Sequence, residues 1–187
     1  MNPNPWWNLT RASAIVAWVL VAVTILWGVL LATRVLKPND RPAWLLDLHR
    51  WLGWLCLAFT GVHMATLVAD DYVEFTLTDL FVPFASSWRP FEVALGVLAM
   101  WTLVAVQASS MLMKRIPKRV WRAIHLSSYG SFALITVHAI LAGSDSGERL
   151  FTAFSTSLAM VTAAVTGLRV VAGHKTLRIG NRNAPRN

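Results

Sequence analysis

The chain has 187 residues, of which 56% are hydrophobic and only 14% are charged. A soluble domain carries about a quarter charged residues, so this composition excludes a water-soluble enzyme. The single cysteine, Cys56, excludes disulfide frameworks, cysteine-based zinc sites, iron–sulfur clusters and haem attached through a Cys-x-x-Cys-His motif. The net charge of +8 is distributed along the chain in a way that indicates membrane topology and not nucleic-acid binding.

Five stretches free of Asp, Glu, Lys and Arg are long enough to cross a bilayer, which takes about 20 apolar residues in a helix. They are 12–33, 51–69, 93–113, 123–144 and 150–168. Backbone in lipid must satisfy its own hydrogen bonds, which forces these stretches into helices. The first stretch lacks a basic leader and a small-residue cleavage site, so we expect it to be retained. We expect helices at about 12–35, 43–69, 91–113, 118–144 and 150–171, in one domain over 1–187. The predicted fold class is an all-α integral membrane bundle.

The basic residues concentrate on one side of the predicted bundle. Fourteen of the 17 fall in the first and third connections or after the last stretch, whereas seven of the nine acids fall on the other side. The positive-inside rule therefore predicts an N-terminus outside and a C-terminus in the cytoplasm. We expect a multi-pass protein of a bacterial plasma membrane.

Four of the five histidines lie at two depths in two predicted helices. His49 and His63 are in the second helix, His125 and His138 are in the fourth, and both helices run in the same direction. The separations within each helix correspond to about 20 Å. The pairs His49–His125 and His63–His138 would each supply two axial imidazoles, one pair for each of two haems stacked across the membrane. We expect His174, in the basic tail, to be solvated.

The spacing of 13 residues between His125 and His138 would turn the two rings about 140° apart on a straight helix. We therefore expect the fourth helix to bend or tighten between them, where small residues cluster. These are Ser127, Ser128, Gly130 and Ser131.

A lone histidine in a membrane is more often a hydrogen-bonded packing residue than a ligand. The sequence also leaves open a single haem, or a proton relay or transition-metal site built from the same rings. The competing function is a non-redox membrane subunit that uses the histidines for proton movement or metal transport. The uncharged stretches contain no acid that would complete a proton relay.

The histidine helices resemble those of a known family. A His-x13-His helix is followed by a Trp-x3-His-x3-Tyr helix start at Trp121, His125 and Tyr129. This arrangement, over about residues 40–145, is similar to the ferric reductase-like transmembrane domain. That superfamily includes NADPH oxidases, ferric reductases and the haem-binding membrane partner of periplasmic methionine sulfoxide reductase, and the segment 89–129 is most similar to the last of these. The resemblance implies two stacked b-type haems that carry electrons across the membrane.

The same resemblance bears on partners. NADPH oxidases have an additional N-terminal helix and a flavin–NADPH domain, and this sequence shows neither. We therefore expect a membrane oxidoreductase or electron-transfer subunit whose donor is a separate flavin reductase or a quinol. The expected acceptor is extracytoplasmic: ferric iron, oxygen or a redox protein. Because both irons would be six-coordinate, we expect no catalytic acid, base or nucleophile.

Five further residues are candidates for contact with the haems. Arg50 and Arg122 either pair with propionates of the inner haem or snorkel to lipid headgroups. Tyr129 either hydrogen-bonds a propionate or anchors the helix at the interface. The apolar segment 70–90 is expected to cover the outer haem, and it ends at Trp88 and Arg89. Its four acids either attract a cationic acceptor such as ferric iron or are merely solvated; they are Asp70, Asp71, Glu74 and Asp79.

Overall fold

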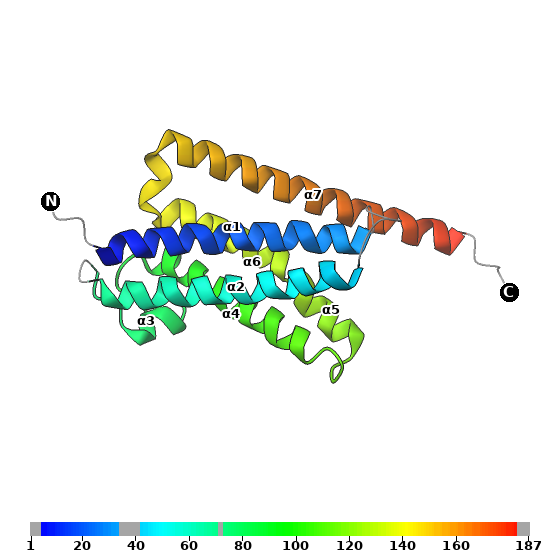
Figure 1. The fold of residues 1–187 in the computed structure, drawn as a ribbon, viewed down its shortest axis with the longest axis horizontal. Coiled ribbons are helices and arrows are strands. Elements are labelled where there is room, and N and C mark those ends of the chain that lie inside the picture. The colour runs from blue at the N-terminus through cyan, green and yellow to red at the C-terminus, as the bar shows by residue number, and fades with distance from the viewer. Residues whose placement is uncertain (1–4, 34–41, 71–72, 183–187) are drawn as a thin grey trace.

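The computed structural model describes residues 5–33, 42–70 and 73–182, which form an all-helical bundle (Figure 1). The elements are α1 (Pro5–Thr33), α2 (Pro42–Ala69), α3 (Leu77–Phe81), α4 (Pro90–Met111), α5 (Lys118–Leu126), α6 (Ser128–Ala142), the 3₁₀ turn η1 (Ser144–Gly147) and α7 (Arg149–Arg182). Five helical segments are long and apolar enough to cross a membrane: α1, α2, α4, α5 with α6, and the first part of α7. The predicted all-α architecture with five such segments is confirmed.

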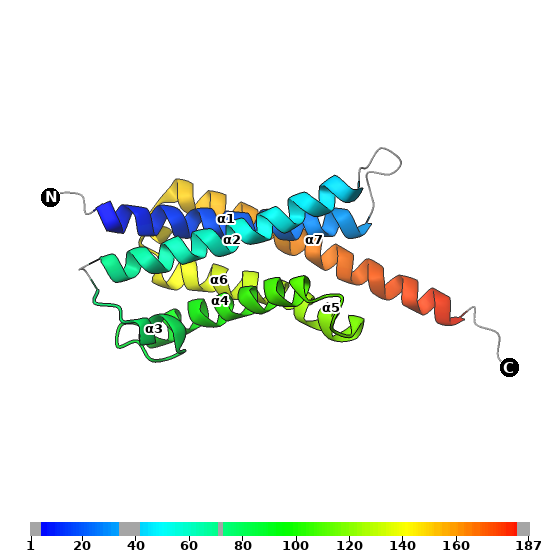
Figure 2. The same cartoon turned by 60° about the horizontal axis from the view of Figure 1, so that its bottom comes forward.

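Two hairpins are layered on each other. Figure 2 shows α1 and α2 in one layer and α4, α5 and α6 in the other, with α7 beside α1. Helix α1 packs against α2, α6 and α7 and contributes eight buried residues. Its buried positions recur every three or four residues and include Thr10, Ser13, Ala17, Val21, Ile25 and Val29. This spacing places them along one face of the helix, where small side chains allow close helix packing.

Two helix boundaries differ from the prediction. Helix α1 begins at Pro5 and not near residue 12, because proline suits a first helical turn and a single arginine does not end a helix. Helix α7 continues to Arg182 and does not end near residue 171, because the sequence has no proline there before Pro185.

The predicted irregularity between His125 and His138 is confirmed, because α5 and α6 are separated by a break at Ser127. The Ser127 N–H donates to the carbonyls of Ala123 (3.3 Å) and Ile124 (3.1 Å), and its hydroxyl donates to Ile124 O (2.6 Å). The bond to Ile124 is the tighter 3₁₀ type, and serine back-bonding of this kind bends helices. The local rotation of the helix therefore changes between the two histidines.

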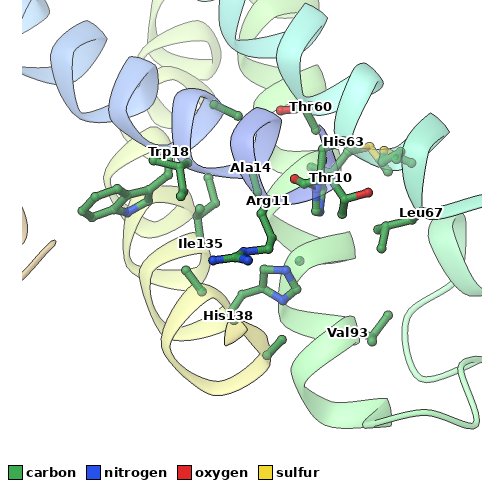
Figure 3. Close-up of a pocket in the computed structure, with 18 of the residues that line it drawn as sticks. Thr10, Arg11, Ala14, Trp18, Thr60, His63, Leu67, Val93, Ile135 and His138 are labelled. Carbon is green, nitrogen blue, oxygen red and sulfur yellow. Dashed lines mark hydrogen bonds between the residues drawn. The ribbon is translucent and has the colours of Figure 1, made fainter. Parts of the chain in front are cut away.

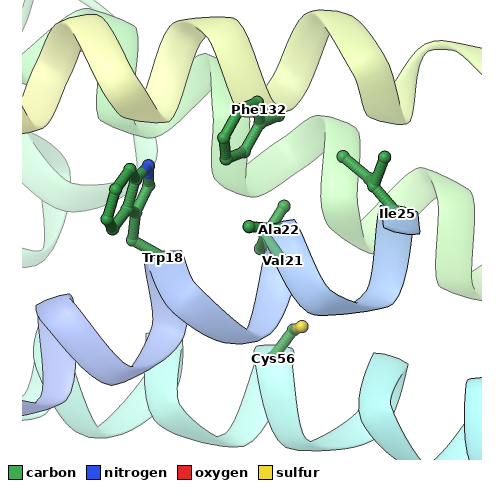
Figure 4. Close-up of a cluster of buried hydrophobic side chains, with 6 residues drawn as sticks. All are labelled: Trp18, Val21, Ala22, Ile25, Cys56 and Phe132. Carbon is green, nitrogen blue, oxygen red and sulfur yellow. The ribbon is translucent and has the colours of Figure 1, made fainter. Parts of the chain in front are cut away.

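Six buried side chains form the centre of the bundle: Trp18, Val21, Ala22 and Ile25 of α1, Cys56 of α2 and Phe132 of α6 (Figure 4). The Trp18 indole stacks on Phe132, with ring centroids 6.1 Å apart and planes 12° apart. Its Nε1–H donates to Thr136 Oγ1 at 3.0 Å, which joins the two layers by a polar contact. Cys56 and Phe132 lie midway along the sequence between the two histidines of their respective helices, so this central cluster lies between the two histidine pairs.

The outside of the bundle is also apolar. Trp51 on α2 is 68% exposed and Leu168 on α7 is 71% exposed. Large apolar patches on a soluble monomer are rare, whereas in a bilayer such side chains contact lipid tails.

The segment between α2 and α4 packs on α4. Trp101 Nε1 donates to the carbonyl of Phe81 at 2.9 Å, which attaches α3 to α4. Helix α3 starts with a capping box, in which the Thr76 hydroxyl accepts from the Asp79 N–H while the Asp79 carboxylate accepts from the Thr76 N–H at 2.8 Å. The hydrogen bonds from Thr76 hold the pKa of Asp79 below its usual value.

Thr136→Val should lower the free energy of unfolding by about 1 kcal/mol, because it leaves the Trp18 N–H buried without an acceptor. Thr102→Val is the matched control: this threonine bonds only to Leu98 O of its own helix, at 2.7 Å. Denaturant unfolding in detergent measures both variants. Equal effects would show that the contact between the layers contributes nothing.

Candidate functional site

The rings of His49 on α2 and His125 on α5 face each other across the bundle. Their centroids are 6.0 Å apart and their planes differ by 62°. Gly28 of α1 makes room for the first ring, since a Cβ at Gly28 would lie 3.1 Å from His49 Cε1. His125 Nδ1 is 3.4 Å from the Ser110 hydroxyl of α4, a long contact. His49 Nδ1 is buried and makes no hydrogen bond within the described part of the chain.

This ring separation suits a shared metal ion. An ion bound to one nitrogen of each imidazole at about 2 Å holds the two centroids roughly 6 Å apart. The separation of the His49 and His125 rings is therefore compatible with one ion held between them.

The second pair, His63 on α2 and His138 on α6, is held by backbone carbonyls. His63 Nδ1 lies 3.1 Å from Thr10 O of α1, and His138 Nδ1 lies 2.7 Å from Glu92 O of α4. A carbonyl can only accept, so in both rings Nδ1 carries the hydrogen and Nε2 has a free lone pair. A hydrogen bond at one ring nitrogen that leaves the other free is the usual arrangement of metal-binding histidines.

His63 and His138 line one cavity of about 230 Å³ between α1, α2, α4 and α6 (Figure 3). Most of its lining is apolar, including Trp18, Val97 and Ile135. Gly96 of α4 makes room for the second ring, because a Cβ there would lie 2.9 Å from His138 Cε1.

The cavity lining also includes a cation, Arg11. Arg11 extends from α1 toward His138 (Figure 3). A guanidinium in mostly apolar surroundings favours an anionic partner. Its position at the edge of an uncharged stretch was the available signal, but sequence alone does not show toward which helix the side chain turns.

Of the two residues predicted near this cavity, Trp88 lines it and Arg89 does not. Arg89 Nη1 donates to Leu141 O in the last turn of α6 at 2.5 Å, and the guanidinium lies 5.1 Å from the Trp88 ring centroid. An arginine at this place satisfies a free carbonyl at the helix end. Arg89 also precedes α4 in the left-handed backbone conformation, with φ 44°.

The three residues predicted to contact the haem between His49 and His125 lie in different surroundings. Arg50 forms an exposed ion pair with Asp47, at 3.1 Å. Arg122 is exposed on α5. Tyr129 packs against the central cluster.

The three acids of the segment 70–90 that the structure describes do not form a group. Asp70 is buried and lines the cavity, Glu74 is exposed, and Asp79 is part of the capping box. Asp71 and the basic residues at 34, 37 and 41 lie outside the described residues, as does the side chain of His174. Among the residues described, no three or more His, Cys, Asp or Glu come together as a possible metal site.

The chain was compared with known proteins. The family model described as ferric reductase like transmembrane component matches residues 13–136, about two thirds of the chain. The chain belongs to this family. The match includes His49, His63 and His125 and ends two residues before His138. Searches of curated proteins and of solved structures gave no match.

Ferric reductase-like transmembrane domains generally bind haem, and membership suggests transmembrane electron transfer. The five helical segments and the family together make this a multi-pass membrane protein. The residues present fit haem, since porphyrin supplies four nitrogens and each site needs only two more ligands from the protein. The free Nε2 atoms of His63 and His138, the apolar cavity and Arg11 suit an apolar macrocycle with acidic side groups.

Gly96→Ala should lower the haem content of the purified protein, because its Cβ would lie too close to the His138 ring. Gly28→Ala should have a smaller effect, since the contact with His49 is less tight at 3.1 Å. Haem absorbance per protein measures both. Gly61→Ala, on α2, is the control because nothing lies within 4 Å of its Cβ position. A loss from Gly61→Ala equal to that from Gly96→Ala would contradict the steric argument.

Proposed function

We propose that this protein is a transmembrane electron conduit with two bis-histidine b-type haems. His49 and His125 bind the inner haem, and His63 and His138 bind the outer haem. The basic end of the bundle faces the cytoplasm, with the N-terminus outside, as the distribution of charges predicts. The membrane is the plasma membrane.

The observation that carries the proposal is the occurrence of two histidine pairs at two levels of the same helices. In each pair one ring comes from α2 and the other from α5 or α6. The two rings of α2 are separated by 14 residues in an unbroken helix, or about 20 Å. Two haems stacked at this separation would let an electron cross the membrane in short transfer steps.

If both histidines of a pair bound one haem, they would leave no position for oxygen or another substrate at its iron. Bound haem supplies a one-electron couple between ferric and ferrous iron. The acceptor would receive its electron at the outer site without bonding to the iron, and the proposal assigns no side chain as acid, base or nucleophile. Trp88 covers this site, and Arg11 provides a cation for its acidic groups.

The central cluster of buried side chains lies between the two levels. Trp18 and Phe132 fill the middle of the bundle with stacked rings, and Trp18 Nε1 is satisfied by Thr136. An electron that moves between the two haems would therefore pass through packed side chains.

The electron donor and the electron acceptor meet the protein on opposite sides of the membrane. A soluble flavin reductase or a membrane quinol donates at the inner site, and ferric iron, oxygen or a redox protein accepts at the outer site. Four exposed cations surround the turn between α4 and α5, where a soluble acidic donor would approach: Lys114, Arg115, Lys118 and Arg119.

Replacing a ligand should remove one haem. His49→Ala or His125→Ala should abolish the inner haem, and His63→Ala or His138→Ala the outer one, so each variant should retain about half of the wild-type haem if the sites load independently. Reduced-minus-oxidised spectra and haem-to-protein stoichiometry measure this.

Unchanged haem content in His49→Ala would refute that ligand assignment. A wild-type protein without a low-spin b-type spectrum would refute the proposal as a whole. Movement of protons or metal ions in vesicles by haem-free protein would instead support the non-redox alternative.

Neutralising Lys114, Arg115, Lys118 and Arg119 to glutamine should slow haem reduction by a soluble flavin reductase. The reason is lost electrostatic steering, so rising salt should slow the wild type as well. Stopped-flow absorbance measures the rate, after a check that the orientation in the membrane is unchanged. A rate that is indifferent to both changes but depends on added quinol would identify a donor dissolved in the membrane.

A further inference from the structure

The indole of Trp121 lies flat against His125. Trp121 precedes His125 by one helical turn on α5, and the two rings stack with centroids 5.1 Å apart and planes 24° apart. Residues four apart share a helix face, so the contact is built into α5 itself. The Trp121 Nε1 atom is buried and has no hydrogen-bond partner within the described residues.

The corresponding tryptophan of the first hairpin is placed differently. Trp44 precedes His49 by five residues, and its ring meets Trp27 edge-on, with centroids 6.0 Å apart and planes 74° apart. Trp44 is also 59% exposed. The two hairpins therefore differ in what lies against the histidine near the basic end.

The ring of His125 is held less firmly by hydrogen bonds than the rings of His63 and His138. Those two rings are fixed by hydrogen bonds to backbone carbonyls at 3.1 and 2.7 Å. Among the residues described, His125 Nδ1 has only the contact with the Ser110 hydroxyl, at 3.4 Å, a length at which a hydrogen bond is weak. Besides the His49 ring, whose centroid is 6.0 Å away, the group that limits rotation about the Cβ–Cγ bond of His125 is therefore the indole stacked on its face.

We propose that Trp121 is a positioning residue, which sets the plane of the His125 imidazole and so the angle between the two axial rings of the inner haem. The indole replaces the carbonyl bond that holds each ring of the outer pair. This inference rests on the proposed function, because it concerns a ligand of the inner haem. The angle between axial imidazole planes determines the g values of a low-spin ferric haem, so it can be measured without activity.

The experiment compares Trp121→Leu, which removes the aromatic face, with Trp121→Phe, which keeps a face but removes the N–H. Trp44→Leu is the matched control at the same end of the bundle. Electron paramagnetic resonance of the oxidised holoprotein should show a shifted inner-haem signal in Trp121→Leu, with the outer-haem signal unchanged. Trp121→Phe and Trp44→Leu should retain the wild-type signals.

A wild-type inner signal in Trp121→Leu would overturn the proposal. If Trp121→Leu loses the inner haem, Trp121→Phe decides: a wild-type signal supports the positioning role, and a shifted or missing signal overturns it. A wild-type protein that binds no haem would refute the proposed function. Two normal haems together with an insensitive Trp121→Leu would refute only this inference.

Discussion

A buried imidazole in a membrane must have its ring N–H satisfied by the chain, because the hydrocarbon offers no water. At His63 and His138 the acceptors are main-chain carbonyls of the opposite helix in the same hairpin, Thr10 O and Glu92 O. Each bond requires the two helices to approach closely at that level. The packing of α1 on α2 and of α4 on α6 is therefore coupled to the orientation of the rings that face the cavity.

The glycines near the histidines also limit where the imidazole rings can lie. The ring of His138 occupies the space beside Gly96, one turn after the carbonyl that it contacts, and the ring of His49 occupies the space beside Gly28. In both places a side chain larger than hydrogen would compete with the imidazole for one volume. Two residues with no side chain beyond hydrogen thus limit where the two imidazole rings can lie.

Much of the architecture could be predicted from the sequence. A long stretch without charged residues predicts a membrane-spanning helix, and the number of residues between two histidines predicts how far apart they lie along that helix. The break at Ser127 was also predictable, since 13 residues cannot keep two rings on one face of a straight helix. The rotation of each helix about its own axis, and the groups that each polar side chain contacts, were not predictable. Thr10, Arg11 and Glu92 reach the site through contacts between helices that are far apart in sequence, and Arg50 pairs with Asp47 of its own helix. Arg89 satisfies the end of α6, because the exposed carbonyl of Leu141 lies beside it.

The layer between the two histidine pairs has a consequence for energy coupling. The six buried side chains of the central cluster include no carboxylate or imidazole that would carry a proton along with an electron; the Cys56 thiol belongs to the cluster, and Tyr129 packs against it. Under the proposed function each transfer moves net charge through the membrane field, which is worth about 2.3 kcal/mol per 100 mV for one elementary charge. With the basic end inside and the cytoplasm negative, the field drives electrons outward. The conduit would then be electrogenic, and it would dissipate part of the membrane potential with every electron that it exports.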